Sequence, residues 1–96
     1  MNWEPSIRPE AIDELREIFD EIEKQKPGKG DEFLNSFESS LEVICSNPLI
    51  FPLRPTGARR KGLGPFPYSL FFLAERGYVV VLGVFHNRSN FAWIEK

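Results

Sequence analysis

The first half of the chain repeats its hydrophobic residues at the spacing of two amphipathic helices. Steps of three and four residues place such positions on one helical face, opposite the charged ones. The first stripe, which follows Pro9, comprises Ile12, Leu15, Phe19 and Ile22. The second, which ends before Asn47 and Pro48, comprises Leu34, Phe37, Leu41 and Ile44. The turn composition of Lys26–Gly30 between them predicts an antiparallel helical hairpin.

The second half of the chain has the residue pattern of strands. Segments 66–74 and 78–86 are rich in aromatic and β-branched residues, and segment 57–63 is a more polar strand candidate. Glu75, Arg76 and Gly77 predict a three-residue hairpin loop. A short extended segment over residues 4–8, anchored by Trp3 and Ile7, precedes the first helix. We therefore predict one α+β domain over residues 1–96, in the order β-α-α-β-β-β, with an antiparallel sheet packed against a two-helix hairpin.

The composition narrows the class of protein. Hydrophobic residues make up 42% of the chain and aromatic residues 14%, which suits a small domain with its own core. The single cysteine, Cys45, excludes an intrachain disulfide and a multi-cysteine metal site, and we expect it to be a buried structural thiol. No signal peptide is visible, and the longest apolar run, Tyr78 to Phe85, is too short to span a bilayer. We expect a soluble, cytoplasmic protein without metal or cofactor.

The charge is divided unevenly along the chain. Residues 1–48 hold five Lys/Arg against twelve Asp/Glu, a net charge of −7, whereas residues 49–96 hold seven against two, a net charge of +5. The basic half could present a local positive surface to nucleic acid. Solvated acidic helices beside a mildly basic sheet explain the same numbers. Charge alone leaves both interpretations open.

No familiar catalytic motif is present. One group of residues could form a site if the strand register brings its members together: Arg59, Arg60, Lys61, Tyr68, His86 and Arg88. With a three-residue loop, Tyr68 lies opposite Val84 and is a diagonal neighbour of His86 on the same face. A two-residue loop would place Tyr68 and His86 on opposite faces. Metal-free RNA cleavage requires a base, an acid and cations for the phosphate, which His86, Tyr68 and the arginines supply in type.

Each of these residues also has a structural interpretation. A histidine at a strand end is more often a hydrogen-bonded surface residue than a catalyst, and Tyr68 in a Phe-Pro-Tyr segment is more often part of the core. The Arg-Arg-Lys segment is typical of an edge strand protected against aggregation. On residue types and spacing alone, the structural interpretation is favoured over catalysis.

Over nearly its whole length the chain resembles the RelE/ParE toxin superfamily, in particular its ParE-like or plasmid-stabilisation members. The resemblance rests on the order and spacing of several segments: Pro9-Glu10-Ala11, Lys26 to Gly30 with Phe33-Leu34, Ile44 to Pro48, Arg59-Arg60, Phe66-Pro67-Tyr68, Val79 to Val84, His86, Arg88 and Trp93. It implies the toxin of a type II toxin–antitoxin pair that inhibits growth, with a cognate antitoxin protein as partner and DNA gyrase or the translating ribosome as target.

The resemblance also implies two activities for members of the superfamily. RelE-like members cut mRNA on the ribosome, and here that role would fall on Arg59 or Arg60, Tyr68, His86 and Arg88. Close relatives often carry a basic residue before the Phe-Pro-Tyr element and a tyrosine later, where this chain has Pro65 and Phe72. These departures favour a gyrase-type or an otherwise non-nucleolytic toxin. The alternatives are a ribosome-dependent mRNA endoribonuclease and a degenerate binding module without toxicity.

Overall fold

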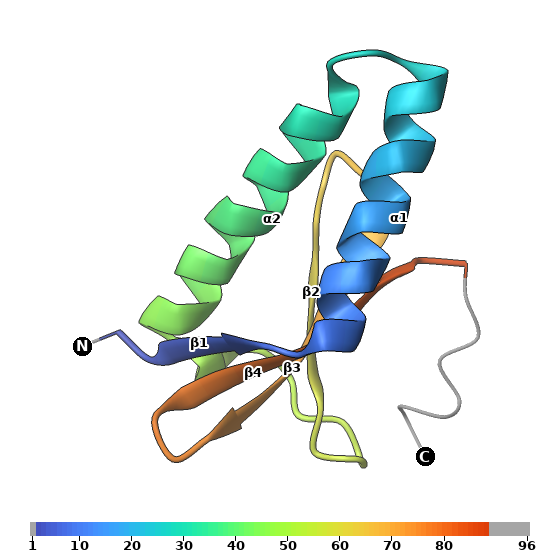
Figure 1. The fold of residues 1–96 in the computed structure, drawn as a ribbon. Coiled ribbons are helices and arrows are strands. Elements are labelled where there is room, and N and C mark those ends of the chain that lie inside the picture. Colours follow the sequence, from blue (N-terminus) through green and yellow to red (C-terminus); the bar gives the residue numbers. More distant parts are fainter. Residues whose placement is uncertain (1, 89–96) are drawn as a thin grey trace.

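The computed structural model describes residues 2–88, and the predicted order of elements is confirmed (Figure 1). Trp93 and the tail from Ser89 to Ile94 lie outside the described residues. The elements are β1 (Glu4–Ile7), α1 (Pro9–Gln25), α2 (Lys29–Ser46), a 3-10 turn (Pro48–Ile50), β2 (Arg59–Gly62), β3 (Tyr68–Glu75) and β4 (Tyr78–His86).

The four described strands form one mixed sheet in the order β1-β4-β3-β2. The strands β2, β3 and β4 are antiparallel neighbours, but β1 lies parallel to β4, from Glu4 opposite Tyr78 to Ile7 opposite Val81. The prediction of a wholly antiparallel sheet is therefore wrong for β1. Tight turns enforce antiparallel pairing, whereas a strand connected through two helices is free to pair in parallel.

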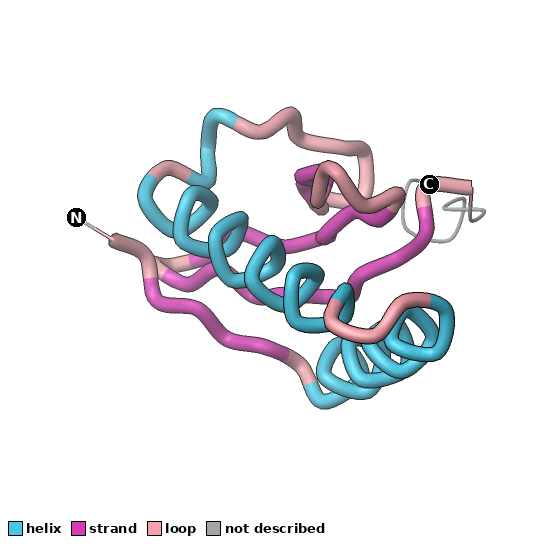
Figure 2. Tube along the Cα trace, turned by 90° about the horizontal axis from the view of Figure 1, so that it is seen from above, coloured by secondary structure: helices cyan, strands magenta, loops and turns pink. Residues whose placement is uncertain are grey.

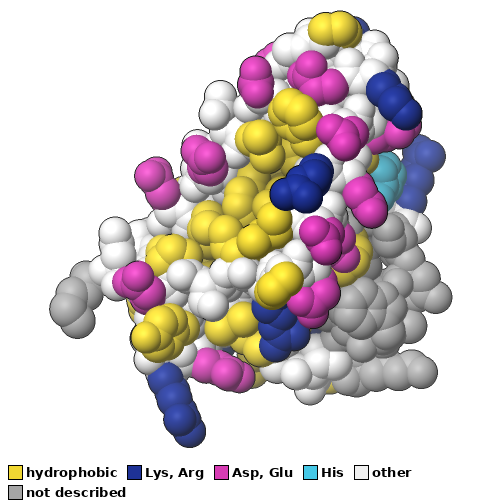
Figure 3. Space-filling view, in the orientation of Figure 1, with side chains coloured by type: hydrophobic (Ala, Val, Ile, Leu, Met, Phe, Trp, Pro, Cys, Tyr) yellow, Lys and Arg dark blue, Asp and Glu magenta, His cyan; other side chains and the backbone are white. Residues whose placement is uncertain are grey.

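The two helices cover one face of the sheet and build the main core against it (Figures 1 and 2). The stripe of α1 that contacts this core is shifted from the predicted one and comprises Ala11, Leu15, Ile18 and Ile22. Ile12 is 44% exposed, and with Phe19 and Leu34 it lines an apolar groove on the outside of the hairpin. In Figure 3 hydrophobic side chains follow the groove between the helices, with acidic side chains beside them. The hydrophobic residues of α1 have the predicted helical spacing, but some of them face the core and others face the groove.

Several smaller predictions are confirmed by the packing of the core. Trp3 and Ile7 pack against it from both ends of β1. Cys45 is a buried free thiol on α2. Burial raises the pKa of this thiol, and the negative charge of Glu4 raises it further, so the thiolate is disfavoured.

The connection between the helices is shorter than predicted, because Lys29 and Gly30 already belong to α2. Glu23 on α1 holds this connection to the helix. Its Oε1 accepts the backbone N–H of Gly28 at 2.9 Å and that of Gly30 at 2.8 Å. These N–H groups lie at the start of α2, where no earlier turn can accept them. Gly30 also lies against the ring of Phe19, so the two helices meet closely here.

The β3–β4 hairpin has a register that alternation did not predict. Glu75 pairs with Tyr78, so the loop has only two residues, Arg76 and Gly77, both with positive φ. Further along, the pairing shifts by one: Phe72 lies opposite Val81, but Phe71 lies opposite Gly83. The predicted three-residue loop is therefore wrong. A β-bulge in β4, with Leu82 as its extra residue, changes the register instead.

One side chain from α1 reaches the bulge. The Oε1 atom of Glu14 accepts the backbone N–H of Val84 at 3.2 Å. Burial raises the pKa of the Glu14 carboxyl, the hydrogen bond from Val84 lowers it in part, and the carboxylates of Glu17 and Glu10 raise it. The net effect is a group that is more easily protonated in the folded chain than in the unfolded chain.

We expect Glu14→Gln to raise the free energy of unfolding near neutral pH relative to the natural chain. A raised folded-state pKa means that the native state binds the proton more tightly, so the natural chain loses stability as the pH rises through this range. Glutamine keeps the acceptor oxygen without the charge. Urea unfolding between about pH 7 and about pH 4 checks this, because the difference should shrink towards the acidic end. A variant less stable at every pH would contradict it.

Candidate functional site

Tyr68 and His86 lie directly opposite each other at the ends of β3 and β4 that are far from the hairpin loop. Their ring centroids are 5.2 Å apart and the rings meet edge to face, at 78°. The expectation that they share a face is confirmed, but the bulge brings this about and not the loop. Without the shift, the register at the loop would place Tyr68 opposite Phe85.

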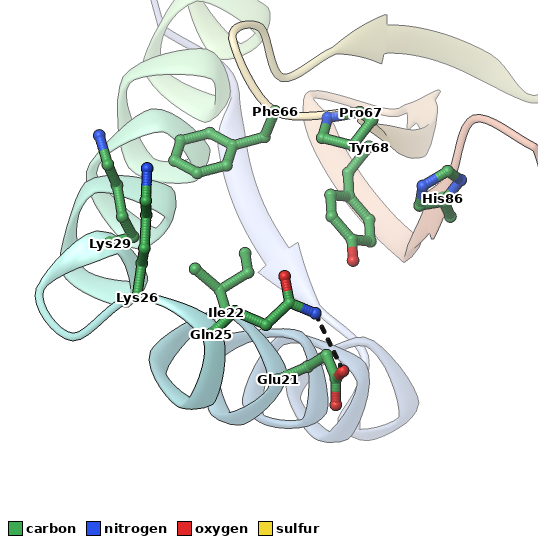
Figure 4. A pocket seen from close by; sticks show the side chains of 9 residues that line it. All are labelled: Glu21, Ile22, Gln25, Lys26, Lys29, Phe66, Pro67, Tyr68 and His86. Carbon is green, nitrogen blue, oxygen red and sulfur yellow. Dashed lines mark hydrogen bonds between the residues drawn. The ribbon is translucent and has the colours of Figure 1, made fainter.

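The two rings form one wall of a cavity of about 720 Å³ between the end of α1, the start of α2 and the segment before β3. Figure 4 shows Tyr68 pointing towards Glu21 and Gln25, with Lys26 and Lys29 near Phe66 on the other side. Gln25 Nε2 donates to Glu21 Oε1 at 3.3 Å. The cavity is lined by Glu21, Ile22, Gln25, Lys26, Lys29, Phe66, Pro67, Tyr68 and His86.

Two hydrogen-bonding side chains, Tyr68 and His86, face this cavity. Burial raises the pKa of the Tyr68 phenol and the negative charge of Glu21 adds to this, so the phenol is a proton donor at neutral pH. His86 Nδ1 accepts the backbone N–H of Arg88 at 3.0 Å. In the neutral ring the proton therefore lies on Nε2, which leaves that nitrogen as the donor. This wall offers two donors, one phenolic and one imidazole.

Arg60, which was predicted to share this surface, points away from the helices. Its Nε donates to Ser69 Oγ at 3.0 Å, and its guanidinium lies 5.8 Å from the centre of the Phe71 ring. Ser69 Oγ donates in turn to Asn87 Oδ1 at 2.6 Å. Phe71 belongs to a second hydrophobic cluster, which is separate from the core under the helices. This row of hydrogen bonds from Arg60 through Ser69 to Asn87 was not predicted from the sequence. Its only sequence signal is a serine, Ser69, within a hydrophobic strand.

The remaining predicted cations do not line the cavity either. Arg59 Nη1 donates to the backbone carbonyls of Phe51 and Leu49, at 2.5 and 3.4 Å, and so ties the loop after α2 to the sheet. Lys61 Nζ donates to the Gly62 carbonyl of its own strand, and Arg88 is exposed. The prediction that all the cations share one surface with Tyr68 and His86 is therefore wrong for Arg60, which lies on the other face of the sheet. Successive residues of β2 point to opposite faces of the sheet, which separates Arg60 from its neighbours.

The described part of the chain carries neither a metal-binding cluster nor a membrane-spanning helix. Residues 2–88 contain no group of three or more His, Cys, Asp or Glu side chains that could hold a metal ion. Within the same residues, no helix has the length and apolar character needed to cross a membrane.

Comparison with known proteins identifies the fold and the family. The chain has the fold of a structure described as the chromosomal ParDE TA system from P. aeruginosa, with a TM-score of 0.76, 17% identity, and coverage of 88% of this chain and 95% of that one. A mutant of the E. coli toxin RelE in the free state gives a TM-score of 0.73 and 17% identity, over 99% of this chain and 94% of that one. None of the curated proteins matches the sequence.

The family follows from the sequence match, because structural likeness at this identity establishes the fold alone. The model described as ParE toxin of type II toxin-antitoxin system, parDE, matches residues 6–91. This range contains both helices and all the described strands except the beginning of β1. The chain therefore belongs to the ParE toxin family of type II toxin–antitoxin systems.

Proposed function

We propose that this ParE-type toxin arrests growth by binding DNA gyrase and does not cut RNA. Membership of the ParE family supports gyrase as the target, since the ParE-like resemblance implied this target. The observation that carries the second half of the proposal is the separation of Arg60 from the Tyr68–His86 pair by the thickness of the sheet. The proposal places the protein in the cytoplasm, where gyrase acts.

The chemistry of RNA cleavage argues in the same direction. A phosphodiester in the transition state needs cations aimed at its oxygens, next to the acid and the base. Arg59 is engaged with backbone carbonyls, and Lys29 forms an ion pair with Glu32 at 3.2 Å. Glu21 lines the cavity together with Lys26 and Lys29, so its carboxylate offsets part of the positive charge that a phosphate would require.

Family membership implies a protein antitoxin as the partner that keeps the toxin silent. We propose that this antitoxin is acidic and partly disordered, because one edge of the sheet is the basic strand β2, with Arg59, Arg60 and Lys61. An extended segment with acidic side chains would pair with such an edge and fold on binding. A neighbouring gene whose small acidic product restores growth during induced expression would support this.

A gyrase assay and a translation assay, run on the same purified protein, test the proposal. We expect loss of DNA supercoiling and accumulation of cleaved DNA–gyrase complexes, while mRNA in a translating extract stays intact. His86→Ala and Tyr68→Phe should retain full toxicity on induced expression. Cuts at codon positions would contradict the proposal, and unaffected growth would support a binding module that has lost toxicity.

A second candidate function, ribosome-dependent mRNA cleavage, is favoured by one observation. The Tyr68–His86 contact brings a phenol and an imidazole of fixed tautomer together at the edge of a cavity. If this pair transfers protons, His86→Ala and Tyr68→Phe should each abolish mRNA cutting without affecting the fold. The same two variants therefore separate the two candidate functions.

A further inference from the structure

We propose that Glu14 is the positioning residue of the candidate site: its hydrogen bond to β4 holds the one-residue shift that places His86 opposite Tyr68. The four residue pairs from Phe72–Val81 to Glu75–Tyr78 follow the register set at the loop, but Tyr68 and His86 lie beyond the shift. Continuation of the loop register would turn His86 to the other face of the sheet. The site therefore exists only while the bulge is maintained.

The place where Glu14 acts is the point at which β4 loses a neighbouring strand. Strand β1 accompanies β4 only as far as Val81, and the bulge at Leu82 follows immediately. Beyond Val81 no described strand accepts the N–H groups on this side of β4, and a buried N–H without an acceptor is costly. Glu14, on the helix that continues from β1, supplies the acceptor for the N–H of Val84.

Gly83 provides the space that this contact requires. A Cβ atom at this position would lie 2.5 Å from Glu14 Oε1 and 2.7 Å from the ring of Phe85. Any other residue would therefore displace the carboxylate or the ring. Since Gly83 has no positive φ, its role here is to make room and not to allow an unusual backbone. The bulge, the glycine and the carboxylate thus form one unit, which we name the Glu14 latch.

The carboxylate of Glu14 is partly desolvated at this position. Glu14 is half-buried, lies near Glu10 and Glu17 on the same helix, and takes part in no ion pair among residues 2–88. A hydrophobic residue at this position would avoid the desolvation of a charge. A residue that aligns β4 has a reason to keep an acceptor oxygen here. This role concerns the geometry of the site, and it holds whether the toxin acts on gyrase or on RNA.

NMR spectroscopy on the full chain tests the latch, with Glu14→Ala, Glu14→Gln and a control, Glu17→Ala, on the exposed side of the same helix. We expect Glu14→Ala to lose the cross-peaks between the rings of Tyr68 and His86. The Val84 amide should exchange about tenfold faster, as befits the loss of a hydrogen bond to a charged group. Glutamine keeps the acceptor, so Glu14→Gln should retain the cross-peaks, and Glu17→Ala should leave the spectrum near β4 unchanged.

A second variant keeps the test decisive if Glu14→Ala does not fold. Gly83→Ala leaves the carboxylate in the chain but fills its place, and we expect the same loss of ring cross-peaks and of Val84 protection. Unchanged cross-peaks and Val84 exchange in either folded variant would overturn the proposal. These readouts do not involve toxicity, so the gyrase proposal and the latch can fail independently.

Discussion

Phe33→Ala is expected to lower the free energy of unfolding by about 3–5 kcal/mol, the range for removing a buried phenylalanine. Phe33 is completely buried on the core face of α2, near the start of the helix. Its ring meets Phe66 and Tyr68 edge to face, with centroids 5.5 and 5.6 Å away. Such ring pairs add to the effect of burial alone. For a domain with about 5–15 kcal/mol in total, the loss would leave little margin.

Urea unfolding followed by circular dichroism measures this loss, and Val43→Ala is the matched control. Val43 lies on the same helix but is 49% exposed, so its truncation should change the stability by less than about 0.5 kcal/mol. Because Phe33 supports Tyr68 from behind, Phe33→Ala should also weaken the contact between Tyr68 and His86. A loss below about 1 kcal/mol would contradict this expectation, because it would mean that the core closes around the space left by the Phe33 ring at little cost.

Gly30→Ala is expected to destabilise the fold by about 1–3 kcal/mol, the range for overpacking. A Cβ atom on Gly30 would lie 2.7 Å from the ring of Phe19 and 2.7 Å from the side chain of Glu23. The same Glu23 accepts two N–H groups at the start of α2, so its displacement would also remove those hydrogen bonds. The sign of the change in the free energy of unfolding is informative, because alanine in a helix is otherwise favoured over glycine by about 1 kcal/mol.

The melting temperature of Gly30→Ala, compared with that of Gly62→Ala, checks this expectation. Gly62 lies in the edge strand β2, where an added Cβ would meet nothing within 4 Å. We expect Gly62→Ala to be neutral or slightly stabilising. A more stable Gly30→Ala would mean that the helices separate easily and that helix propensity decides the outcome.

The helices and strands could be predicted from the sequence because their signals are local. Pro9, the two apolar stripes and Pro48 fix the helical segments within a few residues. The direction of β1 could not be predicted in this way, since its partner β4 lies at the other end of the described chain. Local patterns do not encode which distant strand a segment joins.

The candidate site could be predicted only in part. Alternation in β3 and β4 brought Tyr68 and His86 to one face in the prediction, but through a loop that the hairpin does not have. The side chain that hydrogen-bonds β4 beside the bulge is that of Glu14, which is distant in sequence and looks like one more acidic residue on a helix. The arginines were grouped by type and proximity in sequence, whereas the pleat of β2 and the carbonyl of Phe51 determine where they point.

The parallel pairing of β1 with β4 also has a kinetic consequence. Glu4 and Tyr78 are about 70 residues apart, so this contact closes a loop that contains nearly all the other elements. Loop-closure entropy makes such distant contacts slow to form, whereas the helical hairpin and the β3–β4 ribbon join neighbours along the chain. We expect β1 to dock last during refolding. Until it docks, the β4 edge is open to pairing with other chains, so we expect aggregation during refolding to start from chains in which β1 is still undocked.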